Sequence, residues 1–554
     1  MINIEELVAR MSIEEKVGNL FMCGFDNVSG NTIITDELRT LIEQYHIGGV
    51  IYFSRNIRNP NQVAELSSSI QSLAMNKKYR LPVIISTDQE GGKVVRLKSG
   101  SIFPGNMGLG AINSEEITYN VGRIIGTELI SLGINMNLAP VLDVNTNPLN
   151  PVIGVRSFSS DPAIVSSLGG AFIRGLHSSG VLSVAKHFPG HGDTSLDSHL
   201  ELPVMDKSLD ELMNVHLRPF IDAINIFNVD AIMTAHVVYP VLDKENPATL
   251  SKKILTDLLR NKLGFKGVIM TDCMEMKAIS DRYSAGDSAI KALKAGADMV
   301  LFSHTYKKQV EAYQSVVKAV ENGDISDKEL NEKVTRVLQL KFRIINFVNK
   351  INPSIVGSEE HRAFELYVAR KAVTLLKNEK VLPIKNDKNI IIVDSEMTLS
   401  SPVEEKYNML YLSEVLKKFY NNVMDITINK NPNNEDYDKV VKLLKNVHNS
   451  VFLMVVSSKE QAELLNRLIP FDGDVVVVFY NPFLINRINT KYVNSIIVGY
   501  SNSPCMIVAI GELISGKIKP NGKLPVNLSK PLSTAGNLLG SNNEFGIGSG
   551  MKDF

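Results

Sequence analysis

Short, almost purely apolar runs recur eight times in the first three hundred residues of this 554-residue chain. Most are apolar at every position, which is typical of strands buried on both faces of a sheet. Segments with helical spacing separate most of the runs. This repeated strand–helix alternation predicts a (β/α)8 barrel, with a doubly wound open sheet as the alternative. The runs lie near Cys23 and Ile51 and end at Thr87, Val144, Phe188, Val238, Met274 and Phe302.

A second strand–helix pattern follows a stretch at 349–362 that contains Pro, Gly and Ser, as linkers do. A chain of 554 residues is also too long for one core. The pattern predicts a smaller three-layer α/β/α sandwich. We therefore expect a barrel domain at 1–348, a linker at 349–371 and a C-terminal domain at 372–554. The strand candidates of the second domain are 389–394, 450–456, 474–480 and 494–500.

Composition excludes several classes of protein. Lys+Arg and Asp+Glu are both 59, so nothing favours binding to nucleic acid or to an anionic membrane surface. No apolar run approaches the length of about 18 residues that a membrane span needs. The N-terminus has no basic start followed by an apolar run, so we expect no secretory signal and a cytoplasmic location. Cys23, Cys273 and Cys505 lie far apart in the sequence and have neither a metal-binding nor a disulfide spacing. We interpret them as buried apolar side chains.

The stretch KHFPGHGDTSLDSH, residues 186–199, holds three of the ten histidines of the chain. It begins at the end of the fifth apolar run and continues as a loop rich in Gly and Pro. A barrel enzyme presents its chemistry in loops that follow the strands. Polar side chains at the ends of the predicted strands are therefore the catalytic candidates. They are Asp88, Lys186, His187, His236 (placed within the sixth strand) and Asp272.

These residue types favour acid/base chemistry combined with a nucleophile. Asp272 is an isolated carboxylate, and Asp197 and His199 form a pair. Glycoside hydrolysis fits, because its transition state needs an anion on one face and a proton donor on the other. A metal-dependent lyase or an aldolase with Lys186 as Schiff-base lysine stays open. The sequence contains no Walker loop, no G-x-S-x-G elbow and no H-E-x-x-H motif.

Four motifs in register resemble glycoside hydrolase family 3, and most closely its exo-β-N-acetylglucosaminidases. They are DQEGGKVVR from Asp88, NPVIGVRSF from Asn150, the 186–199 loop, and MTDCMEM around Asp272. The second domain resembles that of the family through AVTLLKNEKVLPI and GKIKPNGKLPVNL, residues 372–384 and 516–528. The resemblance implies the same two-domain fold.

The resemblance also implies roles for individual residues. Asp272 is the expected nucleophile, which forms a glycosyl-enzyme intermediate. His199 is the expected acid/base and Asp197 its partner, because a carboxylate on one ring nitrogen fixes the tautomer and supports the cation. The dyad sits on a loop, so closure over the sugar is expected to bring it into reach. The expected substrate-holding residues are Asp88 as acceptor and Arg96, Arg156, Lys186 and His187 as donors.

The implied activity is retaining removal of non-reducing-end GlcNAc from saccharides such as peptidoglycan fragments, with no metal or cofactor. Alternatives are a phosphorylase, which would use phosphate in place of water, and a broader β-glucosidase or hexosaminidase. A wall-binding protein with a dead site would have lost Asp272 or His199, and both are present. We expect His191 to shape the loop, and leave His236 open between a core histidine and a site residue. Monomer and homodimer both remain open.

Overall fold

The computed structural model describes residues 3–26, 34–345, 350–396, 410–445, 447–528 and 545–554. Eight parallel strands close a barrel in the order β1-β12-β11-β8-β7-β6-β3-β2. Each strand coincides with one of the eight apolar runs, so the predicted barrel is confirmed and the open sheet is excluded. The strands are β1 Phe21–Gly24, β2 Gly49–Tyr52, β3 Ile84–Thr87, β6 Met136–Asn137, β7 Leu182–Phe188, β8 Ala231–Thr234, β11 Val268–Cys273 and β12 Met299–Phe302.

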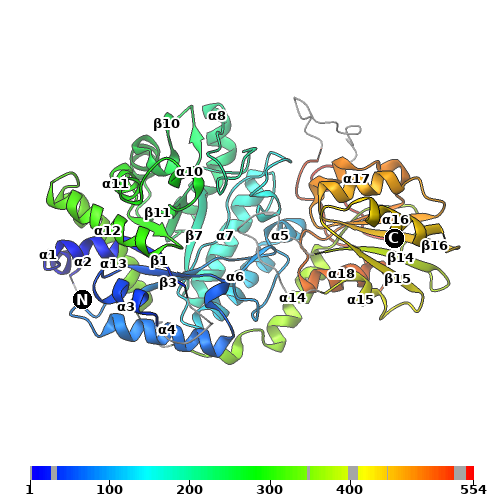
Figure 1. The fold of residues 1–554 in the computed structure, drawn as a ribbon, viewed down its shortest axis with the longest axis horizontal. Helices are drawn as coiled ribbons and strands as arrows, with labels where there is room; N and C mark the ends of the chain where they lie inside the picture. The colour runs from blue at the N-terminus through cyan, green and yellow to red at the C-terminus, as the bar shows by residue number, and fades with distance from the viewer. Residues whose placement is uncertain (1–2, 27–33, 346–349, 397–409, 446, 529–544) are drawn as a thin grey trace.

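Helices surround the barrel on the outside (Figure 1). Their starts are set by local capping, as at α2, where Ser12 and Glu15 form a capping box. The helices are α1 Ile4–Ala9, α2 Ile13–Asn19, α3 Asp36–Glu43, α4 Pro60–Met75, α5 Asn106–Ile112, α6 Glu115–Ile130, α7 Pro162–Ser179, α9 Arg218–Asn225, α10 Lys277–Ser280, α11 Ala285–Ala295, α12 Tyr306–Glu321 and α13 Asp327–Ile344. None of the helices in the described ranges combines the length and apolar character that a bilayer crossing requires.

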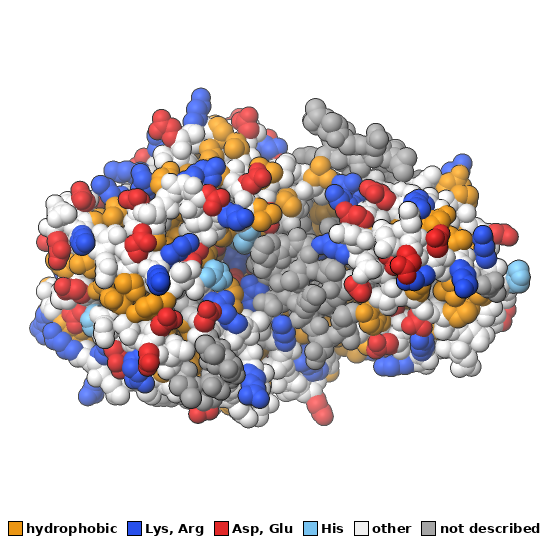
Figure 2. Space-filling view, viewed as in Figure 1, with side chains coloured by type: hydrophobic (Ala, Val, Ile, Leu, Met, Phe, Trp, Pro, Cys, Tyr) orange, Lys and Arg blue, Asp and Glu red, His pale blue; other side chains and the backbone are white. Residues whose placement is uncertain are grey.

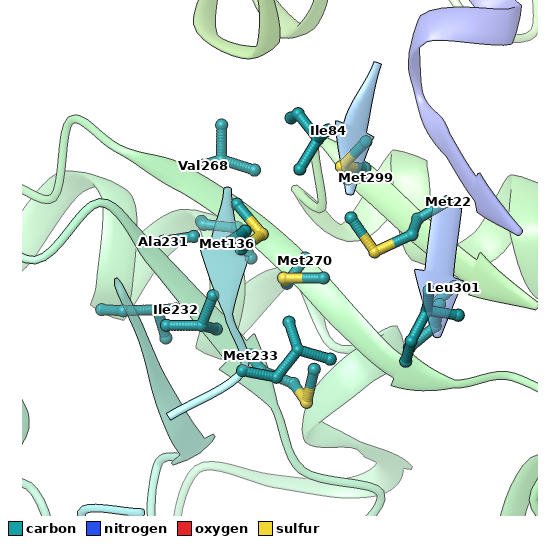
Figure 3. Close-up of a cluster of buried hydrophobic side chains, with 14 of the residues drawn as sticks. Met22, Ile84, Met136, Ala231, Ile232, Met233, Val268, Met270, Met299 and Leu301 are labelled. Carbon is teal, nitrogen blue, oxygen red and sulfur yellow. The ribbon is translucent and has the colours of Figure 1, made fainter. Parts of the chain in front are cut away.

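Methionines fill much of the barrel interior. Figure 3 shows Met22, Met136, Met270 and Met299, from four different strands, packed against one another and against Ile84. All of them are buried. The unbranched thioether side chain adapts to the irregular space inside a barrel of tilted strands. The interior is therefore a packed core, and only the rim at the C-terminal ends of the strands is left for a binding site.

The second domain is built on a six-stranded sheet in the order β13-β18-β17-β16-β14-β15, with β13 antiparallel to β18. Alternate residues face opposite sides, so Ile391 and Phe452 enter one core while Ile390 and Val451 enter another. Helices α17 and α18 cover the two faces (Figure 1). This is the predicted three-layer sandwich. The elements are α14 Glu359–Ala372, β13 Thr374–Asn378, β14 Asn389–Ser395, α15 Leu412–Leu416, β15 Val423–Ile428, α16 Asn434–Lys445, β16 Ser450–Val456, α17 Lys459–Leu468, β17 Asp474–Phe479, β18 Ser495–Val498 and α18 Pro504–Ile514.

The segment after the sandwich returns to the barrel. Ser159 Oγ donates to the carbonyl of Pro525, Asn527 N donates to Ser160 Oγ at 3.1 Å, and Lys523 N donates to Ala111 O at 2.9 Å. This segment therefore supports the barrel loop that follows Arg156. Helix α14 occupies the segment 349–371 from Glu359 onward and ends at Ala372, and the domain boundaries given above remain a prediction.

The placement of His236 within the sixth strand is wrong. Strand β8 ends at Thr234, and His236 lies two residues beyond it. Its Nε2 donates to the carbonyl oxygen of Cys273 at 3.0 Å, and its Nδ1 contacts Thr249 Oγ1 at 2.7 Å. The apolar run continues past the strand because this connection is buried too, and hydropathy alone does not separate the two.

Candidate active site

A pocket of about 440 Å³ opens at the C-terminal rim of the barrel. Figure 2 shows histidine, lysine and arginine side chains on the side of the barrel that faces the second domain. Asp197 does not line the pocket but lies behind His199. The structure thus brings together seven of the eight predicted site residues. These are Asp88, Arg96, Arg156, Lys186, His187, His199 and Asp272.

Asp272 is an ionised carboxylate held among histidines. It lies near the end of β11 and accepts a hydrogen bond from the backbone N–H of Cys273 at 2.7 Å. Burial alone would raise the pKa of Asp272, but the neighbouring His187, His236 and His199 and the Cys273 N–H outweigh it and lower the pKa to about 2. Asp272 is therefore a carboxylate across the physiological pH range, which is the form that attacks an electrophilic carbon.

The Asp197–His199 pair is formed within one turn of the loop. The Nδ1 of His199 lies 2.7 Å from Asp197 Oδ1, and the His199 backbone N–H donates to the same oxygen at 2.9 Å. A carboxylate only accepts, so the proton of the neutral ring is on Nδ1 and the lone pair is on Nε2. His199 lines the pocket with a partly exposed ring. The ring is thus oriented to exchange a proton through Nε2.

Three cations and Asp88 form a wall of the pocket, and Glu90, which does not line the pocket, pairs with two of these cations. Lys186 Nζ lies 2.8 Å from Asp88 Oδ1 and 2.7 Å from Glu90 Oε1. The Arg156 guanidinium donates to both oxygens of Glu90, at 2.9 and 2.8 Å, and Arg96 lies 3.5 Å from Asp88. An ammonium has three N–H groups, so Lys186 keeps one for a ligand. This wall is an interlocked set of donors and acceptors suited to a polyhydroxylated molecule.

Electrostatics keeps Glu90, Arg156 and Lys186 charged although they are buried. Burial alone would raise the pKa of Glu90 and lower that of Arg156. The pairing reverses both shifts, so the pKa of Glu90 is lowered and that of Arg156 is raised. The pKa of Lys186 is likewise raised, because the carboxylates of Asp88 and Glu90 outweigh its burial. These three groups therefore keep their charges without a ligand.

His187 is oriented by a carboxylate that sequence reasoning missed. Its Nδ1 lies 2.7 Å from Asp143 Oδ2, and Asp143 Oδ1 accepts the backbone N–H of His191. Burial alone would raise the pKa of Asp143, but the nearby His187 outweighs this effect, so the pKa of Asp143 is lowered. With Nδ1 donating to Asp143, the Nε2 of His187 is the ring atom left for the pocket. Asp143 thus fixes both the ring and the start of the loop.

Both missed carboxylates carried a sequence signal. Asp143 is a polar residue near the end of the fourth apolar run, the same signal that singled out Asp88 and Asp272. Glu90 stands inside the motif DQEGGKVVR but received no role. Arg55 and His304 also line the pocket, and they follow the second and eighth runs. Strand-end reasoning applied to every run would have found all four.

His191 and His236 have both ring nitrogens in contact with other protein atoms. His191 lines the pocket, but its Nδ1 contacts Thr194 Oγ1 at 2.8 Å and its Nε2 contacts Ser198 Oγ at 3.0 Å. These contacts cross-link the loop from within. His236 has both ring nitrogens engaged beneath Asp272, as a core histidine does.

Within the described ranges, only one group of side chains has the arrangement of metal ligands, and it lies outside this pocket. The pocket itself combines an ionised carboxylate, an oriented imidazole and a polar wall. Such an arrangement can protonate a leaving group on one side of a sugar and attack its anomeric carbon from the other.

Comparison with known proteins agrees with this geometry. The glycosyl hydrolase family 3 N terminal domain matches residues 12–340. The chain is 38% identical over 384 residues to Beta-hexosaminidase A of Pseudoalteromonas piscicida, a match that covers 65% of this chain and 64% of that protein. It is also 38% identical over 277 residues to Beta-hexosaminidase of Pseudomonas aeruginosa PAO1, covering 49% of this chain and 80% of that protein.

A solved structure matches nearly the whole chain. The glycoside hydrolase family 3 beta-N-acetylglucosaminidase from Paenibacillus sp. str. FPU-7 superposes with a TM-score of 0.87 at 37% identity. The match covers 94% of this chain and 99% of that one. Both domains are therefore shared with a protein of known structure.

Proposed function

The chain belongs to glycosyl hydrolase family 3, and on that basis we propose that it is a retaining exo-β-N-acetylglucosaminidase. It would remove GlcNAc from the non-reducing end of saccharides through a glycosyl-enzyme intermediate. The observation that carries this proposal is one pocket that holds both an ionised Asp272 and the Asp197–His199 pair. The relatives described as Beta-hexosaminidase and beta-N-acetylglucosaminidase support the choice of sugar.

In the first step, Asp272 attacks the anomeric carbon and the glycosidic bond breaks. His199, protonated on Nε2, gives this proton to the departing oxygen. In the second step, His199 takes a proton from water, and the resulting hydroxide releases the sugar from Asp272. The Asp197 carboxylate supports the ring in both of its charge states, because the Nδ1–H donates to it throughout.

The charged wall holds the sugar while these steps occur. We assign Asp88 to accept from sugar hydroxyls, and Lys186, His187, Arg96 and Arg156 to donate to hydroxyls or to the acetamido group. Because each of the cations in this wall is already fixed by carboxylates, little side-chain entropy is lost when the sugar binds. Peptidoglycan fragments are the proposed physiological source of such a saccharide.

One assay tests this proposal against its rivals. Chromophore release from an aryl β-GlcNAc and from the matching aryl β-glucoside is measured with and without inorganic phosphate. We expect fast release from the GlcNAc compound alone, at a rate that does not depend on phosphate. Release that requires phosphate and yields a sugar 1-phosphate would make the enzyme a phosphorylase. Equal rates on both substrates would make it a broad β-glycosidase.

A further inference from the structure

Three side chains with metal-binding atoms meet behind the loop that carries the dyad. Asp193 belongs to this loop, Glu211 ends α8 (Leu209–Glu211), and His216 ends the π-helical turn η3 (Leu212–His216). One ligand atom from each lies within 4.8 Å of the other two. We propose that this cluster binds one divalent transition-metal ion, with Zn²⁺ as the representative ion, and that the ion ties the loop to η3.

His216 is the observation that points to a ligand. Its side chain is 0% exposed, and neither of its ring nitrogens has a hydrogen-bond partner among the described residues. A buried imidazole without partners costs free energy, because both nitrogens have lost their water. A metal ion on one nitrogen would compensate for this loss. The loop packs directly against this residue, since a Cβ at Gly190 would lie 2.9 Å from the His216 Cβ.

The donor set suits a transition-metal ion. One imidazole and two carboxylates form a donor set that favours Zn²⁺ or a related ion over Ca²⁺ and Mg²⁺, which prefer oxygen ligands alone.

The ammonium group of Lys207 occupies the position next to the carboxylates that a metal ion would take. Its Nζ lies 3.0 Å from Asp193 and 3.2 Å from Glu211, so the ammonium neutralises the carboxylates. It makes no hydrogen bond to either nitrogen of His216. The Lys207 side chain is 23% exposed, so it can turn into solvent when a metal ion enters. Lys207 thus competes with the ion for the two carboxylates. Removing Lys207 should therefore strengthen metal binding, whereas removing a ligand should weaken it.

Small movements would complete the site. Bonds of about 2.0–2.2 Å in a tetrahedral zinc site place neighbouring ligand atoms about 3.3 Å apart. Glu211 is 37% exposed and can rotate to shorten its distances. Asp193 also accepts a hydrogen bond from the hydroxyl of Thr146, which orients a ligating carboxylate. An ion here would restrain the part of the loop that leads to Asp197 and His199.

The test measures binding to the full-length protein after chelator treatment and dialysis. Titration calorimetry with Zn²⁺ and the visible absorption of Co²⁺ report stoichiometry and affinity. We expect one ion at this cluster. His216→Gln should weaken its binding by at least about tenfold. Lys207→Met should tighten it by about fivefold or more, because a unit charge about 4 Å away is removed. Neither residue lines the catalytic pocket, so hydrolysis of an aryl glycoside without metal should continue in both variants.

Two controls keep the outcome clear. His199→Asn should leave this affinity unchanged, because the histidines of the pocket are not the ligands. Amide exchange at residues 190–199 should slow when Zn²⁺ is added to the wild type. If His216→Gln fails to fold, Glu211→Gln, at a partly exposed position, should weaken binding in its place. Absence of binding by both wild type and Lys207→Met would overturn the proposal, as would binding lost in His199→Asn but kept in His216→Gln.

Discussion

Two buried lysines lie at opposite ends of the barrel in contrasting surroundings. Lys186, in β7 at the rim, has carboxylate oxygens of Asp88 and Glu90 at 2.8 and 2.7 Å. Lys341, in α13 at the base, donates to the side-chain oxygen of Asn19 at 2.7 Å, an uncharged partner. Their exposed fractions are almost the same, 2% and 3%. The difference between them is therefore one of partners and not of burial.

The partners decide the charge of each lysine. Burial lowers the pKa of both, but at Lys186 the two carboxylates reverse the shift and raise the pKa. At Lys341 burial acts together with the nearby charge of Lys77, and the pKa falls to about 7. At the rim, carboxylates thus keep Lys186 charged, and a ligand can use this charge. At the base, Lys341 has an uncharged partner and its charge is not stabilised in this way. Function at the rim and stability at the base is the usual division in this fold.

The largest expected effect of a substitution at the rim is on turnover. Asp272→Asn keeps the size of the side chain but removes the anion that forms the intermediate, so kcat on an aryl β-GlcNAc should fall by about a thousandfold or more. Lys341→Met, the matched change at the base, should leave kcat within about twofold. Retention by Asp272→Asn of more than about a tenth of wild-type kcat would remove Asp272 from its role.

The next effect concerns the carboxylates that distinguish the rim. Glu90→Gln leaves Lys186 and Arg156 buried with one anion fewer, so the protein should lose about 3–5 kcal/mol of stability. Urea unfolding followed by circular dichroism measures this loss. The control is Glu116→Gln, at an exposed position of α6, which should change stability by less than about 0.5 kcal/mol. A Glu90→Gln protein as stable as the control would mean that the wall does not depend on paired charges.

The sequence predicted the strands better than the partners of each side chain. All eight barrel strands followed from apolar runs, because a strand buried on both faces leaves that pattern. Two strands of the second domain, β13 and β15, were not foreseen. The β15 sequence alternates and lies at a sheet edge, with a largely half-buried surface, and β13 is the strand that runs antiparallel.

At the candidate site, the residues that would touch a sugar came from motifs, whereas their supports needed coordinates. The pairing of Glu90 with both Arg156 and Lys186 joins segments that lie 66 or more positions apart, and no local pattern encodes it. Asp143 could have been found from its strand end, but its two contacts to His187 and His191 could not. The missing His216 partners are likewise visible only in three dimensions.

A third prediction separates proton transfer from substrate holding within the rim. A poor leaving group needs a proton, while an activated aryl oxide departs without one. His199→Ala should therefore lose about a hundredfold or more on a GlcNAc disaccharide but much less on an activated aryl glycoside. Asp197→Ala should show the same pattern more weakly, since it acts through the ring. Added azide should partly restore turnover of the aryl substrate; equal losses on both substrates without azide rescue would assign His199 to binding.

The last expected effect lies at the base, and its size depends on pH. The pKa of Lys341 is about 7 in the folded protein and near its ordinary 10.5 when unfolded. Below pH 7 both states carry the charge, and the folded state bears the full cost of an ammonium buried beside a neutral amide. Between pH 7 and about 10.5 only the unfolded state holds this proton, so the cost falls by about 1.4 kcal/mol per pH unit.

Lys341→Met should therefore gain the most stability over wild type at pH 6–7, and the gain should shrink toward pH 9. Melting temperatures of the two proteins across this range measure it, with Lys307→Met, at an exposed position of α12, as the control that shows no such trend. A difference between Lys341→Met and wild type that is constant with pH would mean that Lys341 stays charged in the folded protein across this range, as Lys186 does, and the contrast between the two lysines would then not be one of charge.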